Sequence, residues 1–294
     1  MHLRTLRTLV EVVRQGGFSA AAKAVFATQP TVSKAIQQME DELGVTLFDR
    51  AGHRPVLTAA GEIVYRRALA MLNERDDMLR EIDDLRGLRR GQLRLGLPPL
   101  GSAELFAPLF TAYRQRYPGV EIRLIEHGAK RLEDILLAGG VEMIATLLPL
   151  ADDFEFEPIR REPLMALLPA QHPLAGRARV SIADLRDTPF ILFEEGFALN
   201  AMLATACQRA GFTPVEAGRS GQITFIVALV ASGLGCAFMP RLIAEQRPHP
   251  DVRLVPLDEA ETHWHVALAW RRGGYLSDAA RAWLKLAHGT LKGA

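Results

Sequence analysis

The stretch of residues 18–43 constrains the fold more than any other part of the sequence. It reads FSAAAKAVFATQPTVSKAIQQMEDEL, which predicts two short helices joined by a tight turn. Ser19 is expected to cap a helix over residues 20–25, whose small side chains allow another helix to approach closely. Thr28 is expected to cap the next helix, with Pro30 in its first turn. This is the pattern of a helix-turn-helix, an element that reads DNA.

The second of these helices has two contrasting faces. Val32, Ile36, Met39 and Leu43 follow one another at spacings of 4, 3 and 4, which predicts one buried face. The opposite face carries side chains that suit contacts with bases or phosphates. These residues are Gln29, Thr31, Ser33, Lys34 and Gln37. The alternative interpretation is an ordinary solvated helix in a small helical domain.

A β-hairpin is predicted directly after this helix. Gly44 is expected to end the helix, residues 45–48 read as a short strand, and residues 56–57 as the returning strand. The turn DRAGHRP between them is basic, and its arginines would lie beside the DNA backbone or minor groove. The alternative is a surface hairpin with incidental charge. The predicted DNA-binding residues are Ser19, Gln29, Pro30, Thr31, Ser33, Lys34, Gln37, Arg50 and Arg54.

A long helix is predicted from residue 59 to about residue 88. A heptad seam runs along it, with one polar interruption at Arg75. A solitary helix of this length would be marginal, so it needs a partner. We interpret it as a dimerisation helix, and packing against its own chain is the alternative. The seam consists of Val64, Ala68, Met71, Arg75, Met78, Ile82 and Leu85.

Charge and composition limit the class of protein. The formal net charge is only +1, and residues 1–58 carry seven Lys/Arg against five acids, so DNA contact would depend on specific polar groups and on the doubled charge of a dimer. The two cysteines are too few for a secreted disulfide scaffold. We find neither an apolar signal core at the N-terminus nor an apolar run of the roughly 20 residues that span a bilayer. A cytoplasmic protein is therefore expected.

Residues 89–294 alternate between predicted strands and helices, which indicates two α/β halves, each with a parallel sheet. In the first half, strands are expected at 92–97, 121–126 and 143–147, and helices at 102–117 and 130–138. In the second half, strands are expected near 164–168, 190–193 and 235–239, and helices near 200–210 and 223–232. A strand over 263–270 and a closing helix over 277–291 follow.

Ligands of such sheets bind outside the carboxyl ends of the strands, near helix N-termini. The first such crevice is predicted at residues 98–102, where Ser102 is expected to cap a helix and free N–H groups favour an anion. Glu194 and Glu195 either are solvated or select a ligand that carries a donor group. The predicted ligand-binding residues are Pro99, Gly101, Ser102, Ala129, Thr146, Phe193, Glu194, Phe197, Gln222 and Thr224.

The tract SAAAKAVFATQPTVSKAIQQMEDELGVTLFDR, followed by Arg54 and LTAAGE, resembles the LysR-type transcriptional regulators. The resemblance is ungapped through Glu62. It implies an α+β multidomain fold: a winged helix-turn-helix over 1–58, a linker helix over 59–88 and an effector domain over 89–294 that is similar to type 2 periplasmic binding proteins. The effector domain would divide into subdomain I (89–162 and 266–294) and subdomain II (163–265).

The same resemblance implies the partners. They are promoter DNA, RNA polymerase, a second copy of the chain in a dimer or dimer of dimers, and a small-molecule effector between the two subdomains, expected to be an organic acid. Ala129 stands where the family often carries Ser or Thr, which weakens the expectation of a hydroxyl contact there.

No enzyme class is favoured. The patterns C-x-x-C, H-E-x-x-H, G-x-S-x-G and the P-loop do not occur, so we predict no catalytic or metal-binding residues and no resident cofactor. His263 and His265 share a face of a predicted strand and could in principle bind a metal, but an incidental polar face is the favoured interpretation.

Two rival functions remain open at this stage. One is a solute-binding or metabolic α/β protein with an incidental helical module, which a gel-shift on the chain's own upstream DNA would separate from a regulator. The other is a regulator that responds to oxidation of Cys207 and Cys236 instead of to a ligand. A variant with both cysteines changed to serine that still responds to an inducer would exclude it.

Overall fold

The structure is a computed structural model that describes residues 2–49, 55–85, 91–259 and 262–291. The chain divides into two compact units. The first unit contains residues 1–85 and 137–139, and the second contains residues 86–136 and 140–294. No helix in the part of the chain that the structure describes is both long and apolar enough to cross a membrane.

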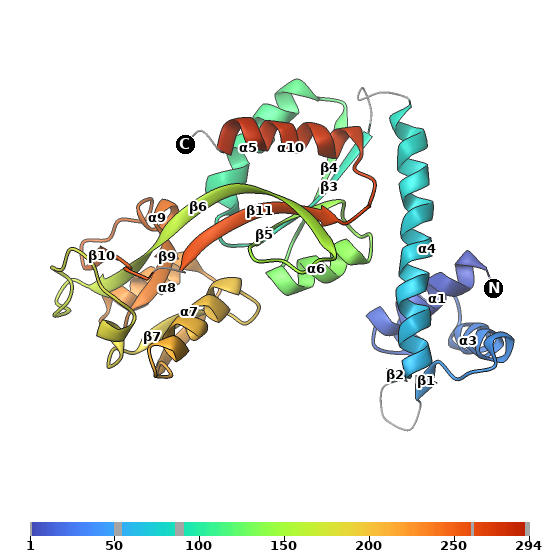
Figure 1. The fold of residues 1–294 in the computed structure, drawn as a ribbon, viewed down its shortest axis with the longest axis horizontal. Helices are drawn as coiled ribbons and strands as arrows, with labels where there is room; N and C mark the ends of the chain where they lie inside the picture. Colours follow the sequence, from blue (N-terminus) through green and yellow to red (C-terminus); the bar gives the residue numbers. More distant parts are fainter. Residues whose placement is uncertain (1, 50–54, 86–90, 260–261, 292–294) are drawn as a thin grey trace. The chain divides into compact units, whose positions relative to one another are not determined.

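The first unit is built from helices and one small hairpin (Figure 1). Its elements are α1 (Leu3–Arg14), α2 (Phe18–Ala24), α3 (Gln29–Leu43), β1 (Phe48–Asp49), β2 (Val56–Leu57) and α4 (Ala59–Asp84). The strands β1 and β2 pair antiparallel, as the predicted hairpin requires. The core of this unit contains the buried side chains of Leu6, Leu9, Val10, Val12, Ala21, Ala22, Val32, Ile36, Met39, Leu47, Phe48 and Ala68.

The predicted signals at both ends of α3 are confirmed. The Thr28 Oγ1 accepts a hydrogen bond from the Thr31 N–H at 3.4 Å, and Pro30 lies in the first turn. Gly44 ends the helix with a left-handed φ of 69°, which glycine adopts without strain. The turn between α2 and α3 is tight, and Phe26 takes a left-handed φ of 53° within it.

Two sequence-based predictions in this unit are wrong. Ser19 does not cap α2, because the helix begins one residue earlier, at Phe18, with Gly17 at the N-cap and no side-chain capping bond. Ser19 is therefore exposed within the first turn. Leu43 does not join the buried face of α3: it is 41 % exposed, because it lies in the last turn, beyond the core contacts of Met39.

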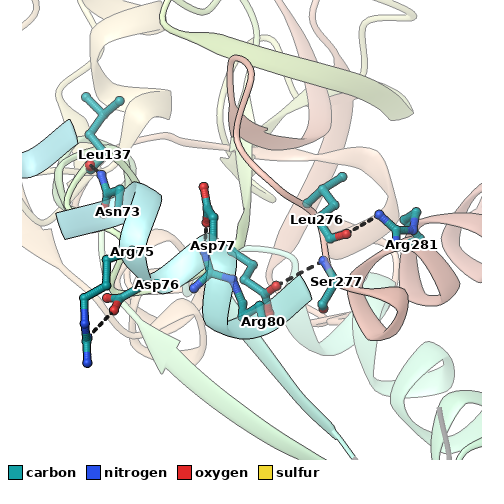
Figure 2. A network of polar contacts seen from close by, with 10 residues as sticks. Asn73, Arg75, Asp76, Asp77, Arg80, Leu137, Leu276, Ser277 and Arg281 are labelled. Carbon is teal, nitrogen blue, oxygen red and sulfur yellow. Dashed lines mark hydrogen bonds and ion pairs between the residues drawn. The ribbon is translucent and has the colours of Figure 1, made fainter. Parts of the chain in front are cut away.

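The helix α4 is anchored at its start and exposes part of its apolar seam. The Thr58 Oγ1 accepts a hydrogen bond from the Gly61 N–H at 3.0 Å, and Ala68 is buried in the core of the first unit. Further along, polar pairs interrupt the helix surface: Arg75 with Asp76 at 2.7 Å, and Arg80 with Asp77 (Figure 2). The exposed apolar seam residues are Met71, Met78, Ile82 and Leu85.

The second unit is an α/β structure. Its strands are β3 (Gly91–Leu97), β4 (Val120–Glu126), β5 (Met143–Leu147), β6 (Phe154–Pro169), β7 (Phe190–Phe193), β8 (Glu216–Ser220), β9 (Ala237–Pro240), β10 (Val252–Pro256) and β11 (His263–Arg271). Its helices are α5 (Ser102–Arg116), α6 (Ala129–Leu137), the 3-10 turn η1 (Ala183–Leu185), α7 (Ala198–Arg209), α8 (Ile223–Ala231), α9 (Arg241–Ala244) and α10 (Asp278–Leu291).

The first half of this unit forms as the sequence predicts. Strand β3 pairs parallel with both β4 and β5, with α5 and α6 in the connections. Helix α10 returns to pack beside α5 (Figure 1). Trp283 is fully buried between these helices, with its ring 4.7 Å from that of Phe110 and 5.4 Å from that of Tyr113. We call β3–β5, α5, α6 and α10 the first half.

The second half is not the all-parallel sheet that the sequence predicted. Among the described strands only β7 and β8 form a regular parallel pair there, while β9 and β10 both run antiparallel to β6. The physical reason is the length of β6, which has 16 residues and runs with β11 from the first half into the second (Figure 1). A strand that serves both halves takes antiparallel partners at each end. We call β7–β10 and α7–α9 the second half.

Candidate DNA-binding surface and ligand cleft

The outer face of α3 is open to solvent. Gln29, Pro30, Thr31, Lys34 and Gln37 are exposed, and Ser33 is half-buried. The Gln29 Nε2 donates a hydrogen bond to the Ser33 Oγ at 3.1 Å, so the two side chains are held together on that face. Because Val32, Ile36 and Met39 are buried on the other side, the polar face points away from the core. Arg50 and Arg54, the predicted wing residues, lie outside the described residues.

Glu40 has a structural role that sequence reasoning missed. Its Oε1 accepts hydrogen bonds from the backbone N–H groups of Leu47, at 2.7 Å, and Phe48, at 3.3 Å. The side chain therefore ties α3 to the strand of the hairpin. The available signal was an acid near the helix end, followed by two buried residues whose N–H groups need acceptors.

A cleft opens in the second unit at the carboxyl ends of β3 and β5. It contains about 410 Å³ of space not filled by atoms, of which only about 30 Å³ can hold the centre of a water molecule. The cleft is therefore narrow. Its lining is Pro98, Pro99, Leu100, Gly128, Ala129, Thr146, Leu147, Gly196, Phe197, Ala198, Leu199, Trp264 and Val266.

The structure brings four of the predicted ligand-binding residues together in this lining: Pro99, Ala129, Thr146 and Phe197. The others lie outside it. These are Gly101, Ser102, Phe193, Glu194, Gln222 and Thr224. Phe193 lies behind the lining, stacked on Phe197 with ring centroids 4.9 Å apart. The space beside Gly101 is filled by the Trp264 ring, so Gly101 supports the wall from outside.

The predicted capping role of Ser102 is wrong. The N-cap of α5 is Gly101, with a φ of 87°, and no side chain caps this helix. The Ser102 hydroxyl donates instead to the Pro98 carbonyl. Sequence reasoning also missed the apolar lining of β11. Trp264 and Val266 lie two residues apart and so share one face of that strand, and the alternation His-Trp-His-Val was the available signal.

The side chains that line the cleft are apolar apart from the Thr146 hydroxyl and the indole N–H of Trp264. None of the residues in the lining carries a charged side chain. The side chain of Thr146 is buried, and its Oγ1 has no hydrogen-bond partner within the described part of the chain. The helices α6 and α7 both begin at the cleft, with Ala129 and Ala198, and the first N–H groups of a helix favour a negative charge. This arrangement suits a small acid with an apolar body.

The geometry does not favour the two alternatives of thiol oxidation and metal binding. Cys207 and Cys236 are both free and fully buried, and burial raises the pKa of their thiols to about 11 and about 12. A thiol reacts through its thiolate, so these side chains are poorly suited to sensing an oxidant. Among the described residues no group of three His, Cys, Asp or Glu side chains is arranged to hold a metal ion.

A helix-turn-helix with an exposed polar face, combined with a unit that encloses a ligand cleft, defines a ligand-responsive DNA-binding protein. Comparison with known families agrees. Residues 3–62 match the bacterial regulatory helix-turn-helix protein, lysR family, and residues 86–292 match the LysR substrate binding domain. The chain belongs to the LysR family of transcriptional regulators, and it is a regulator rather than an enzyme. The predicted fold class is thereby confirmed.

Similar proteins span nearly the whole chain. The HTH-type transcriptional regulator YwbI of Bacillus subtilis is 34 % identical and covers 97 % of this chain and 95 % of its own length. The RuBisCO operon transcriptional regulator of Allochromatium vinosum is 31 % identical, and the match covers 95 % of this chain and 93 % of that protein. A full-length OxyR structure from Pseudomonas aeruginosa has a TM-score of 0.69 at 26 % identity. The match covers 99 % of this chain and 95 % of the OxyR chain. Regulators of this family bind DNA and oligomerise.

Proposed function

We propose that this regulator reads promoter DNA through the outer face of α3 and responds to a small carboxylic acid bound in the cleft. The observation that carries the ligand class is the buried, unpaired Thr146 hydroxyl in a largely apolar cleft. A carboxylate accepts a hydrogen bond from that hydroxyl and from the first N–H groups of α6 and α7. The rest of the ligand is apolar and small, because the cleft is narrow and lined by Phe197 and Trp264.

The effect of the acid on DNA binding depends on the two halves of the second unit. Because the cleft is lined by α6 of the first half and α7 of the second, a bound acid stabilises the arrangement in which the halves meet. The acid changes DNA binding only by the difference between its affinities for the two arrangements. A screen of small carboxylic acids against the full chain by thermal shift identifies the ligand, since a bound ligand raises the unfolding temperature.

We further propose that the chain acts in the cytoplasm as a homotetramer, a dimer of dimers, and contacts RNA polymerase. The exposed apolar seam of α4, from Met71 to Leu85, supports self-association, because such a strip is covered when two helices pair.

Changing Thr146 to Val tests the ligand site. The variant is expected to bind the acid selected by the screen about 10- to 150-fold more weakly, because a hydrogen bond to a charged group contributes about 1.5–3 kcal/mol. The free protein is expected to be as stable as before or more so, because a buried hydroxyl without a partner is removed. Titration calorimetry and thermal unfolding measure the two effects, with Thr111→Val on α5 as control. Unchanged affinity in the Thr146 variant would exclude the site.

Changing Gln29 and Ser33 to Ala tests the reading face. Each is expected to reduce the preference for the natural operator over a base-substituted one by about 5- to 150-fold, because a well-placed base contact is worth about 1–3 kcal/mol of discrimination. Quantitative gel-shifts measure this preference. They are run at a fixed salt concentration, since the contribution of phosphate contacts to DNA affinity depends on salt. Gln15→Ala, an exposed amide at the end of α1, is the matched control. An unchanged preference in both variants would show that α3 does not read the bases.

A further inference from the structure

Phe26 has the most exposed large apolar side chain in the described part of the chain. It is 97 % exposed, although phenylalanine gains more than most residues from burial. Phe26 lies in the turn between α2 and α3, three residues before Gln29, the first residue of α3. The ring therefore contributes nothing to the core of the first unit, and packing within the chain does not explain why a phenylalanine stands here.

The backbone at Phe26 also disfavours a phenylalanine. The Phe26 N–H donates a hydrogen bond to the Lys23 carbonyl at 3.3 Å, and the Ala27 N–H donates one to the Ala22 carbonyl at 2.9 Å. This is the Schellman motif, whose left-handed residue is usually glycine and sometimes asparagine. With its φ of 53°, Phe26 is the one non-glycine residue at positive φ in the part of the chain that the structure describes. A side chain that is both strained and exposed indicates a role outside the fold.

The place of the turn in the first unit indicates what the ring contacts. In helix-turn-helix proteins the N-terminal residues of the recognition helix contact the base edges, so the turn that leads into α3 approaches the same stretch of the major groove. The charges around the ring suit a polyanion. Residues 18–39 include Lys23 and Lys34 but no acid, and both lysines are exposed. DNA is therefore favoured over a second copy of the chain as the partner of this ring.

We propose that Phe26 contacts DNA by packing its ring against the 5-methyl group of a thymine beside the bases that α3 reads. Such an apolar contact distinguishes thymine from cytosine in the major groove. It covers the ring, which water surrounds in the free protein, and so offsets the strain of the backbone. This inference rests on the proposed reading face of α3, and it adds an apolar contact to the polar ones of that face.

Phe26→Gly separates a role in binding from a role in folding. The variant is expected to melt about 2 to 8 °C higher, because glycine adopts the left-handed backbone without strain and no buried contact is lost. Its affinity for the chain's own upstream DNA is expected to fall about ten-fold or more, because the apolar contact is lost. Thermal unfolding followed by circular dichroism and quantitative gel-shifts at a fixed salt concentration measure the two effects.

Two further variants serve as controls. Phe26→Tyr keeps the ring and is expected to bind the upstream DNA within about two-fold of the unchanged protein. Val45→Ala changes another exposed apolar side chain, which lies beyond the opposite end of α3. It is expected to leave DNA binding unchanged.

Removing the methyl groups from the DNA tests the same contact from the other side. A fragment synthesised with deoxyuridine in place of thymidine keeps the hydrogen-bonding groups of every base pair but lacks the 5-methyl groups. On this fragment the unchanged protein is expected to lose about four-fold more affinity than Phe26→Gly loses, which corresponds to one buried methyl group. The difference between the two losses belongs to Phe26, since the other thymine contacts are the same for both proteins.

Four results would overturn the proposal. They are an unchanged DNA affinity in Phe26→Gly, equal losses of the two proteins on the deoxyuridine fragment, a lower melting temperature in Phe26→Gly, and a smaller oligomer in size-exclusion chromatography. The third would assign the ring to the fold, and the fourth would place it between copies of the chain. If the Gln29 and Ser33 variants lose base preference while Phe26→Gly binds normally, the reading face stands and only the Phe26 contact is wrong. No effect in any of the three variants would overturn both.

Discussion

Gly128→Ala is expected to weaken binding of the cleft acid by about 5- to 150-fold, without unfolding the protein. A Cβ at residue 128 would lie 2.7 Å from the backbone oxygen of Gly196, which belongs to the loop before α7. Backbone atoms cannot move aside as a flexible side chain can, so the two halves must separate to admit the methyl group. Overpacking of this kind costs about 1–3 kcal/mol, which corresponds to the stated range of affinity.

The local backbone should not oppose the change. Residue 128 itself has no left-handed φ, so alanine is compatible with the local backbone. Calorimetry with the acid found in the screen measures the loss of affinity, and thermal unfolding of the free chain checks the fold. Gly176→Ala is the matched control, because a Cβ there meets no atom within 4 Å. An affinity equal to that of the unchanged protein would mean that the halves need not meet at Gly128 and Gly196 when the acid binds.

The helix-turn-helix could be predicted because its determinants are local. The spacing of Val32, Ile36 and Met39 gives the buried face, while Thr28 and Gly44 supply the capping and the left-handed turn that end α3. The same reasoning placed Ser19 wrongly at an N-cap, because a serine inside the first turn looks the same in sequence as one before it. Glu40 could not be assigned, since its partners become neighbours only after the chain has turned back.

The cleft could be predicted only in part. Thr146 and Ala129 were found because they lie at the carboxyl end of a strand or open a helix, and chain order alone places them at the carboxyl edge of the sheet. Trp264 could not be found in this way. It comes from β11, which runs antiparallel beside β5 although more than a hundred residues separate the two strands. Such long-range pairing leaves no trace in local periodicity.

Strand β6 shows the same limit. Only residues 164–168 of β6 were predicted as strand, because the preceding segment FEFEPIRREP lacks a continuous apolar run. That segment is the outer edge of the sheet, where charged residues are expected, since an exposed edge with charges resists pairing with another chain. Arg241, which follows β9, has its Nε 3.7 Å from the Oε2 of Glu162 on β6, and no pattern along the chain brings these two residues together.

Glu40→Ala is expected to destabilise the DNA-binding unit by about 2–4 kcal/mol, because it leaves the buried backbone N–H groups of Leu47 and Phe48 without their acceptor. For a unit of this size the melting temperature should fall by about 10 to 20 °C. Glu40→Gln keeps one carbonyl oxygen as an acceptor and should lose less. Thermal unfolding of the full chain, followed by circular dichroism, measures the transition of this unit.

Charge and hydrogen bonding can be separated here, because Asp41 lies next to Glu40, is exposed, and carries the same charge. Asp41→Ala removes a negative charge at the same end of α3 but no bond to the hairpin, so its melting temperature should stay unchanged. Its affinity for DNA should stay the same or rise, since a negative charge near phosphates is removed. Glu40→Ala should instead bind DNA more weakly at temperatures where the unit is partly unfolded. Equal melting temperatures for the two variants would show that the Glu40 hydrogen bonds do not hold the hairpin on α3.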